Sequence, residues 1–463
     1  MLIDSHAHLD FPPLYGDLNN VLNRAEKAGV RYILSVGLLS AESQTIEKTL
    51  KIARENKNIF YSVGIHPHDA KDGDTKLINY LESSLKNDNP IAVGETGLDY
   101  HYDNSPREMQ RKIFRYQIEL AIELDLPLII HTREALDDTI SILNEYKTAK
   151  LSGVFHCFTG DLKEAQRLLD FKGFCLSIPG VVTFPKAEKL RKALEDIPQN
   201  RTLIETDCPY LAPLPHRGKT NEPAFVAHIA EKVAEIWGVT PHDVGRITSR
   251  NFARLFGVGP EEPPAIAYSI RNSLYLNITN NCTLACKFCG KRSDYVVKGH
   301  YLKLPEEPSV EEIWRAVSDA DSYDEIVFCG YGEPTIRLEV LKEVARRIKG
   351  RHPKMKVRVN TDGLMNLREG RDATAELKGL VDTFSVSLNA SDGKSYAAIC
   401  PSKYGERAYE EVKRFIATAR NGGFDVQATA VNLPDLDVEK VRAVAERELK
   451  VKFRVRKYNN IGS

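Results

Sequence analysis

Histidines and carboxylates recur through the first half of the chain, and most of them follow a short run of apolar residues. Imidazole and carboxylate groups are common ligands of divalent ions. His6 and His8 stand two residues apart, so in a strand both side chains would point to the same face and could bind one ion together. The full set is His6, His8, His66, His68, Glu95, His131, His156 and Asp207. Such a set suits two divalent ions about 4 Å apart, an arrangement that serves phosphoester hydrolysis.

Three cysteines of the second half, Cys282, Cys286 and Cys289, lie within eight positions and directly after a predicted strand. Each can supply a thiolate to one iron of a cubane cluster, which leaves the fourth iron open. A zinc site is the alternative, and it would normally need a fourth Cys or His nearby. The next cysteine, Cys329, is forty residues further on. The spacing therefore favours an iron–sulfur cluster.

The elements that precede the metal-binding candidates must position them. Short runs rich in β-branched residues alternate with helix-length amphipathic segments, which predicts eight strands at residues 2–4, 32–36, 60–65, 91–94, 128–130, 153–155, 174–178 and 202–204. Eight β/α repeats are the count of a closed (β/α)₈ barrel. In such a barrel the chemistry lies where strands run into the following loops, and nearly all the candidates stand at those points.

A composition change divides the chain. Residues 257–265 combine two glycines, three prolines and two acidic residues, which neither helix nor strand can use. We predict a domain of residues 1–258, a linker of residues 259–267 and a second domain of residues 268–463. Six further strands are predicted in the second domain, at residues 273–278, 325–328, 357–360, 383–387, 426–430 and 453–455. Six repeats are too few to close the same barrel, so we expect an open (β/α)₆ partial barrel, again of the α/β class.

The overall composition narrows the partners and the location. Lys plus Arg equals Asp plus Glu at 64 each, so any contact with nucleic acid must be local rather than due to a global positive field. The first residues show no basic segment followed by an apolar stretch, and no run of about 18 apolar residues occurs. We therefore expect a cytoplasmic protein with no membrane partner. Eight cysteines are too few and too unevenly spread for a disulfide framework.

Six motifs of the first domain resemble the TatD family of metal-dependent deoxyribonucleases. They are DSHAHL at residues 4–9, GIHPH at 64–68, GETGLD at 94–99, HTR at 131–133, HCFTG at 156–160 and ETDCPY at 205–210. The resemblance runs from residue 1 to about 258. It implies hydrolysis of DNA and metal binding by His6, His8, Glu95, His131, His156 and Asp207, with Glu95 bridging two ions. Members are usually Mg-dependent, whereas imidazole ligands favour ions such as Zn or Mn, so Mg, Mn and Zn stay open.

Three residues of these motifs are also candidates for direct catalytic roles. Asp207 is expected to orient and deprotonate the attacking water, because a carboxylate beside an ion can accept a proton from a water next to it. Glu95 would hold both ions in place. His66, or less favourably His68, would contact the scissile phosphate or interact with a metal ligand from outside the coordination sphere.

Other residues beside the ligands have weaker signals. Arg133 follows a ligand closely and could clamp phosphate, because a guanidinium group matches phosphate oxygens in a bidentate manner. An ion pair with Glu134 or Asp137 is the alternative. Cys157 and Cys208 stand next to ligands and are expected to be packing residues.

The cysteine loop resembles the radical S-adenosylmethionine superfamily, whose C-x3-C-x-aromatic-C motif it matches with Phe288 as the aromatic residue. The resemblance covers about residues 268–463. It implies that Cys282, Cys286 and Cys289 bind a [4Fe-4S] cluster whose open iron is chelated by S-adenosylmethionine. Reductive cleavage of that cofactor would give a 5′-deoxyadenosyl radical.

Further positions are candidate contacts for S-adenosylmethionine. CGYGEP at residues 329–334 resembles the superfamily's Gly-Gly-Glu-Pro element, which bonds the methionine amino group; here Tyr331 replaces the first glycine of the pair, and Gly332 and Glu333 are retained. Ser387 and Asn389 follow a later predicted strand and, being two residues apart, would share a face. The two domains together resemble TatD-associated radical SAM proteins.

Two alternatives stay open. The barrel could act on an amide or a lactone, as other amidohydrolases do, although many of those bridge their metals with a carboxylated lysine where this chain has Glu95. The cluster domain could be a redox-sensing or binding module. The favoured prediction is two enzymes in one chain, with DNA or a nucleotide as the first substrate, an unknown second substrate and an external electron donor for the cluster. The sequence does not predict an oligomeric state.

Overall fold

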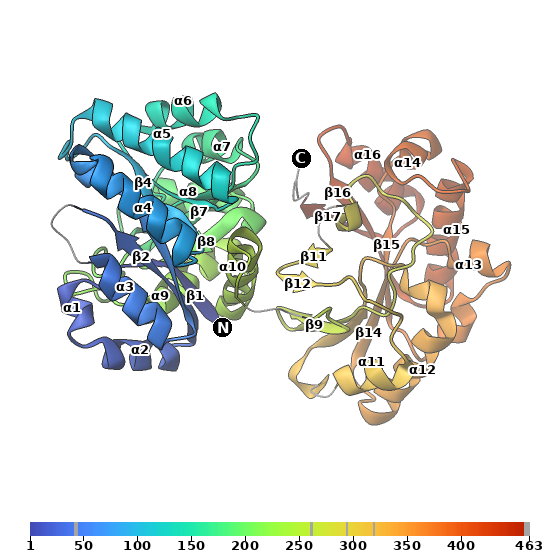
Figure 1. The fold of residues 1–463 in the computed structure, drawn as a ribbon. Coiled ribbons are helices and arrows are strands. Elements are labelled where there is room, and N and C mark those ends of the chain that lie inside the picture. Colours follow the sequence, from blue (N-terminus) through green and yellow to red (C-terminus); the bar gives the residue numbers. More distant parts are fainter. Residues whose placement is uncertain (41–44, 260–262, 293–294, 318–319, 458–463) are drawn as a thin grey trace. The chain divides into compact units, whose positions relative to one another are not determined.

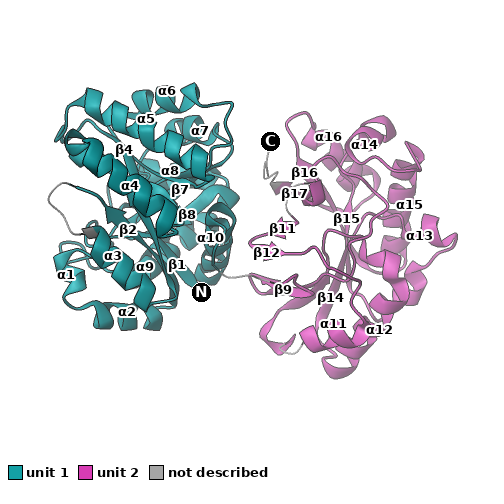
Figure 2. Ribbon diagram, viewed as in Figure 1, with its two compact units in different colours: residues 1–261 teal, residues 262–463 magenta. Residues whose placement is uncertain are grey.

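The structure is a computed structural model that describes residues 1–40, 45–259, 263–292, 295–317 and 320–457. The chain forms two compact units, Met1–Glu261 and Glu262–Ser463 (Figure 2). The division falls inside the predicted linker of residues 259–267, of which residues 260–262 lie outside the described ranges.

The first unit is built around eight parallel strands in chain order (Figure 1). They are β1 (Leu2–Ala7), β2 (Val30–Leu38), β3 (Ile59–Gly64), β4 (Val93–Asp99), β5 (Leu128–Arg133), β6 (Gly153–Phe155), β7 (Phe174–Ile178) and β8 (Thr202–Ile204). A parallel bridge between Ala7 and Cys208 joins the segment after β8 to β1. The predicted (β/α)₈ barrel is confirmed.

Helices cover the outside of this barrel (Figure 1). They are α1 (Pro12–Tyr15), α2 (Leu18–Lys27), α3 (Thr45–Glu55), α4 (Thr75–Asn87), α5 (Arg107–Leu124), α6 (Leu136–Glu145), α7 (Leu162–Leu169), α8 (Glu188–Asp196), α9 (Val226–Trp237) and α10 (Pro241–Phe256). Local sequence explains where several begin. Asp161 and Glu164 form a reciprocal capping box at the start of α7, and Thr240 caps α10, which begins with Pro241.

In three strands of the barrel that extend past their predicted ends, the extensions carry candidate ligands. β1 continues to Ala7, β4 to Asp99 and β5 to Arg133, and all seven residues of β4 are buried. A polar side chain in such a position is read as a loop residue from sequence, because burying it costs free energy unless it is paired. Here the buried polar side chains pair with one another, so the strand continues through them.

The second unit contains a seven-stranded sheet in the order β17-β16-β15-β14-β13-β10-β9 (Figure 1). Its strands are β9 (Ala267–Ile270), β10 (Ser273–Leu276), β13 (Glu325–Phe328), β14 (Lys356–Thr361), β15 (Thr383–Ser387), β16 (Asp425–Asn432) and β17 (Lys452–Lys457). Six of them are parallel, as predicted. β9 was not predicted, because it begins at the end of the presumed linker; it pairs antiparallel with β10.

The remaining elements of this unit are a small hairpin and a set of helices. β11 (Val296–Val297) pairs with β12 (His300–Tyr301). The helices are α11 (Val310–Ala316), α12 (Leu338–Arg351), α13 (Met365–Glu369), α14 (Gly393–Ile399), α15 (Arg407–Asn421) and α16 (Val438–Ala443). Among the described residues of both units, no helix is long and apolar enough to cross a membrane.

Candidate functional site

The first group of candidate ligands gathers where β1 meets the segment after β8. Nε2 of His6 lies 3.3 Å from Nε2 of His8, and these two nitrogens lie 3.4 and 3.9 Å from Oε2 of Glu95. Oδ1 of Asp207 lies 3.7 Å from the His6 nitrogen and 3.5 Å from the His8 nitrogen. Four donor atoms therefore face one point.

The second group uses the other oxygen of Glu95. Oε1 lies 2.8 Å from Nδ1 of His131, 2.7 Å from Nε2 of His156 and 3.4 Å from Nε2 of His66. The His131 and His156 nitrogens are 3.1 Å apart. One carboxylate thus faces two separate sets of donors, as a ligand that bridges two ions must.

The carboxylates of the site are ionised in spite of their burial. Burial alone would raise the pKa of Glu95, but His156, His66 and His131 outweigh it and hold this pKa well below its usual range. Burial likewise raises the pKa of Asp207 while His8 and His6 lower it, and the net pKa is below its usual value. The pKa of His66 falls to about 4, because burial disfavours the charged ring. Ionised carboxylates are the form in which these side chains bind metal.

Two buried carboxylates for which the sequence suggested no role support these ligands. One is Asp99, whose Oδ2 lies 3.0 Å from Nε2 of His68 and 3.1 Å from Nε2 of His131. His68 is therefore turned toward Asp99, and His66 is the member of the pair that faces Glu95. The sequence did contain a signal, since Asp99 follows Glu95 by four residues and the strand period places both on one face.

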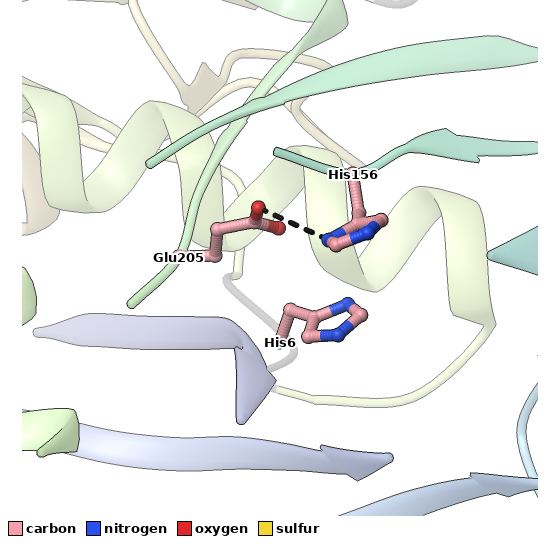
Figure 3. Close-up of side chains that lie close together, drawn as sticks. All are labelled: His6, His156 and Glu205. Atoms are coloured by element: carbon pink, nitrogen blue, oxygen red, sulfur yellow. Dashed lines mark ion pairs between the residues drawn. The ribbon is translucent and has the colours of Figure 1, made fainter. Parts of the chain in front are cut away.

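The other supporting carboxylate is Glu205, which lies beside two imidazole rings (Figure 3). Its Oε1 lies 3.5 Å from Nδ1 of His156 and accepts a hydrogen bond from the backbone N–H of Cys157. One ligand atom each of His6, His156 and Glu205 lie within 4.8 Å of one another, and the two rings stack with centroids 4.1 Å apart. Glu205 stands two residues before Asp207, and that spacing could have drawn attention to it.

A cavity of about 990 Å³ opens over both groups of ligands. Arg133 lines it, and the guanidinium carbon lies 4.7 Å from the ring centroid of Tyr102, which lines it as well. The acids considered as partners of Arg133 make other ion pairs: Glu134 lies 2.7 Å from His101, and Asp137 lies 2.7 Å from Arg167. Arg133 is therefore on the cavity wall, and neither acid is its ion-pair partner.

The cysteine loop of the second unit follows β10, and all three of its cysteines are free thiols. The motif that begins after β13 contacts this loop closely. The backbone N–H of Glu333 donates to the carbonyl oxygen of Asn281 at 2.7 Å. A Cβ atom on Gly332 would lie only 2.1 Å from the carbonyl oxygen of Thr279, so this approach requires glycine. Burial raises the pKa of Cys282 to about 12.

The side chain of Glu333 is occupied by contacts within the protein. Its Oε1 accepts hydrogen bonds from the backbone and hydroxyl of Thr335 and from the hydroxyl of Thr361, and its Oε2 accepts one from the backbone N–H of Asp362 at 2.6 Å. Burial, and then the charge of Asp362, raises the pKa of Glu333 to about 8. The carboxyl group therefore ties the motif to the end of β14.

Contrary to the prediction, Ser387 and Asn389 do not share a face. β15 ends at Ser387, and Asn389 has a φ of 54°, so the alternation of a strand does not extend to it. The hydroxyl of Ser387 lies 3.4 Å from a guanidinium nitrogen of Arg456. The amide nitrogen of Asn389 instead lies 3.5 Å from Sγ of Cys400, in the protein interior.

Comparison with known proteins identifies the barrel. The family described as TatD related DNase matches residues 3–257. This chain belongs to the TatD-related DNase family. The uncharacterized metal-dependent hydrolase YabD of Bacillus subtilis is 40% identical to it over 258 residues, which are 56% of this chain and 100% of YabD. The uncharacterized metal-dependent hydrolase YcfH of Escherichia coli K12 is 40% identical over 263 residues, 56% of this chain and 96% of YcfH.

Structural similarity agrees with the TatD assignment. The crystal structure of YjjV, a TatD homologue from Escherichia coli K12, matches with a TM-score of 0.52 and 29% identity, and covers 56% of this chain and 98% of YjjV. A second family, the radical SAM superfamily, matches residues 276–447. The chain is thus a TatD-type metal-dependent hydrolase domain followed by a radical SAM domain, and both predicted families are confirmed.

Proposed function

We propose that the TatD-related unit hydrolyses phosphodiester bonds of DNA with two divalent ions. The observation that carries this proposal is the carboxylate of Glu95, whose two oxygens face two separate sets of donor atoms. Two ions held in this way would polarise the phosphate, activate the attacking water and stabilise the leaving oxygen.

The residues fit two such ions. Imidazole nitrogens face each other at 3.3 Å in the first group and at 3.1 Å in the second, and carboxylate oxygens face the same two points. A cation at each point would satisfy these donors together. The first would be held by His6, His8, Glu95 and Asp207, and the second by Glu95, His131 and His156.

The chain's own groups would then carry the proton and orient the substrate. Asp207 is ionised and can align a water molecule and accept its proton. Arg133, on the cavity wall, can bind two oxygens of a phosphate. His66 also lines the cavity, where it can contact the scissile phosphate. Asp99 orients the ring of His131 and Glu205 that of His156, each at the ring nitrogen that does not face the metal site.

We propose that the radical SAM unit cleaves S-adenosylmethionine at a [4Fe-4S] cluster held by Cys282, Cys286 and Cys289. The three cysteines stand on one loop with no fourth Cys or His close to them in sequence, which a zinc site would normally need. They suit a cluster in which each thiolate binds its own iron.

The full-length chain tests the hydrolase proposal. Incubation with a DNA oligonucleotide and Mg, Mn or Zn should release shorter fragments, and a chelator should stop the reaction until the ion is added back. Turnover of amides or lactones without cleavage of DNA would instead place the unit among the other amidohydrolases.

Anaerobic reconstitution tests the second proposal. The chain should take up iron and sulfide, and with a strong reductant and S-adenosylmethionine it should produce 5′-deoxyadenosine. Stoichiometric zinc and no 5′-deoxyadenosine would contradict the assignment. A cluster that forms but leaves the cofactor intact would support the redox-sensing alternative. In the cell, an external electron donor would supply the reductant.

A further inference from the structure

The cysteine loop runs beside the segment that ends α14. Two backbone hydrogen bonds join them, from the N–H of Ala285 to the carbonyl oxygen of Pro401 at 2.8 Å and from the N–H of Lys287 to that of Ile399 at 3.0 Å. The segments are therefore antiparallel, and Cys286 and Cys400 lie opposite each other between the two bonds. In an antiparallel ladder, a pair at such a position has its Cα atoms about 4.5 Å apart and its side chains on the same side.

The thiols of Cys286 and Cys400 lie near enough to interact. A hydrogen bond with the thiol of Cys400, followed by burial, raises the pKa of Cys286. Cys400 is 1% exposed, and the amide nitrogen of Asn389 lies 3.5 Å from its sulfur. Cys286 is half-buried on the loop. One predicted cluster ligand therefore has a second thiol packed directly against it.

We propose that Cys286 and Cys400 form a disulfide when the loop lacks its cluster and meets a peroxide. The Sγ atoms become bonded, two S–H bonds break, and hydrogen peroxide takes up the two electrons and two protons as two molecules of water. Disulfides join Cα atoms about 4.4–6.8 Å apart, so the backbone pairing already provides a suitable separation.

The disulfide would protect Cys286 from further oxidation, and it would also prevent the loop from binding a cluster. It holds Cys286 in a reducible form, whereas further oxidation to a sulfinic acid is irreversible without a dedicated enzyme. It also removes one of the three thiolates, so a cluster cannot be rebuilt until a thiol reductant opens the bond. This second consequence rests on the proposed function, while the disulfide itself does not.

Peptide mapping of the full-length chain tests the disulfide directly. Cluster-free protein is treated with hydrogen peroxide, its free thiols are alkylated, and it is digested with trypsin without reductant. Cleavage after Lys287 separates Cys286 from Cys289. The peptide that ends at Lys287 should be found linked to the peptide that contains Cys400, with fragment spectra assigning Cys286 rather than Cys282. An alkylated Cys400 after this treatment would overturn the proposal.

A matched pair of variants tests the protective role. In Cys400→Ser, peroxide should drive Cys286 to the sulfinic acid, seen as a gain of two oxygens, and a thiol reductant should no longer restore uptake of iron and sulfide. Wild type and the control Cys329→Ser should recover at least about tenfold more cluster after reduction. Equal recovery by Cys400→Ser would refute the protective role. Failure of every form to bind a cluster, with the disulfide present, would count against the proposed function alone.

Discussion

Nδ1 of His156 lies 3.5 Å from Oε1 of Glu205, while Nε2 of the same ring lies 2.7 Å from Oε1 of Glu95. The ring is thus held between two carboxylates, one at each nitrogen. A carboxylate on the far nitrogen of a metal-binding histidine fixes its tautomer and orientation. Because Glu205 is completely buried, its interaction with His156 is little screened by water.

Replacing Glu205 by Gln keeps the shape of the side chain and removes its charge. The affinity for a divalent ion should fall by roughly 10- to 100-fold, because the ring loses the negative charge that orients it. Competition with a chromogenic chelator measures this affinity without any substrate. Asp103→Asn is the control, since Asp103 is exposed and pairs with Arg107. Unchanged affinity in Glu205→Gln would mean that packing alone orients His156.

Asp207→Asn should lower the rate of DNA cleavage by at least ~10²-fold, the scale expected when a positioned base is lost. An amide cannot accept the proton that the ionised carboxylate can. Rates at saturating metal, together with the bound-metal content, separate loss of the base from loss of an ion. Asp137→Asn should cleave at the wild-type rate, because Asp137 pairs with Arg167 on the surface. Undiminished cleavage by Asp207→Asn would remove this residue from the mechanism.

Asp4 makes the stability of the barrel depend on pH. Burial raises its pKa to about 8 in the folded chain, against 3.8 for the ordinary carboxyl group. Between these values the folded state keeps a proton that the unfolded state has released, so the free energy of unfolding falls as pH rises. Relative to Asp4→Asn, the wild type should lose up to about 1.4 kcal/mol per pH unit between pH 5 and 8.

The two tryptophans make this measurement specific to one unit. Trp237 lies in α9 of the barrel and Trp314 in α11 of the second unit. In a Trp314→Phe background, the fluorescence of Trp237 during urea unfolding reports the barrel alone. Parallel pH profiles for the wild type and Asp4→Asn would show that Asp4 does not hold a proton at neutral pH.

Cys282→Ala and Cys289→Ala should each abolish the cluster, because three thiolates supply all the protein ligation and each holds one iron. Iron and sulfide content and the yield of 5′-deoxyadenosine after anaerobic reconstitution are the measurements. Cys329→Ala should retain both, since Cys329 stands outside the loop, at the end of β13. DNA cleavage should be the same in all three, because the ligands of the barrel are imidazoles and carboxylates.

The strand count of the barrel and both sets of candidate ligands could be predicted from sequence, because hydrophobic alternation and residue spacing are local signals. β9 could not be predicted, because Ala267 and the residues after it follow a proline-rich segment, and the strand is stabilised by pairing with β10 and by the packing of Tyr268. The extension of β4 through Glu95 to Asp99 was missed for a related reason. Its polar residues are buried only because partners from other strands pair with them.

Side-chain direction was harder to predict than position. Glu333 was predicted to contact S-adenosylmethionine, yet hydrogen bonds from Thr335, Thr361 and Asp362 occupy its carboxyl group, and nothing in the motif indicates these partners. Asn389 was paired with Ser387 by assuming a strand that ends two residues earlier. In both cases the deciding contacts come from residues distant in sequence or from the local backbone angle.

The closure of the barrel also bears on how the protein is made. The backbone N–H of Asp207 donates to the carbonyl of His6 at 2.9 Å, so the metal site joins the first strand to the segment after the last. During synthesis, His6 and His8 leave the ribosome early and have no Asp207 to meet until the whole barrel has emerged. Closing a loop of this length is slow, and domains generally fold as units with the N-terminal one first. The barrel can therefore fold before synthesis of the second unit is finished.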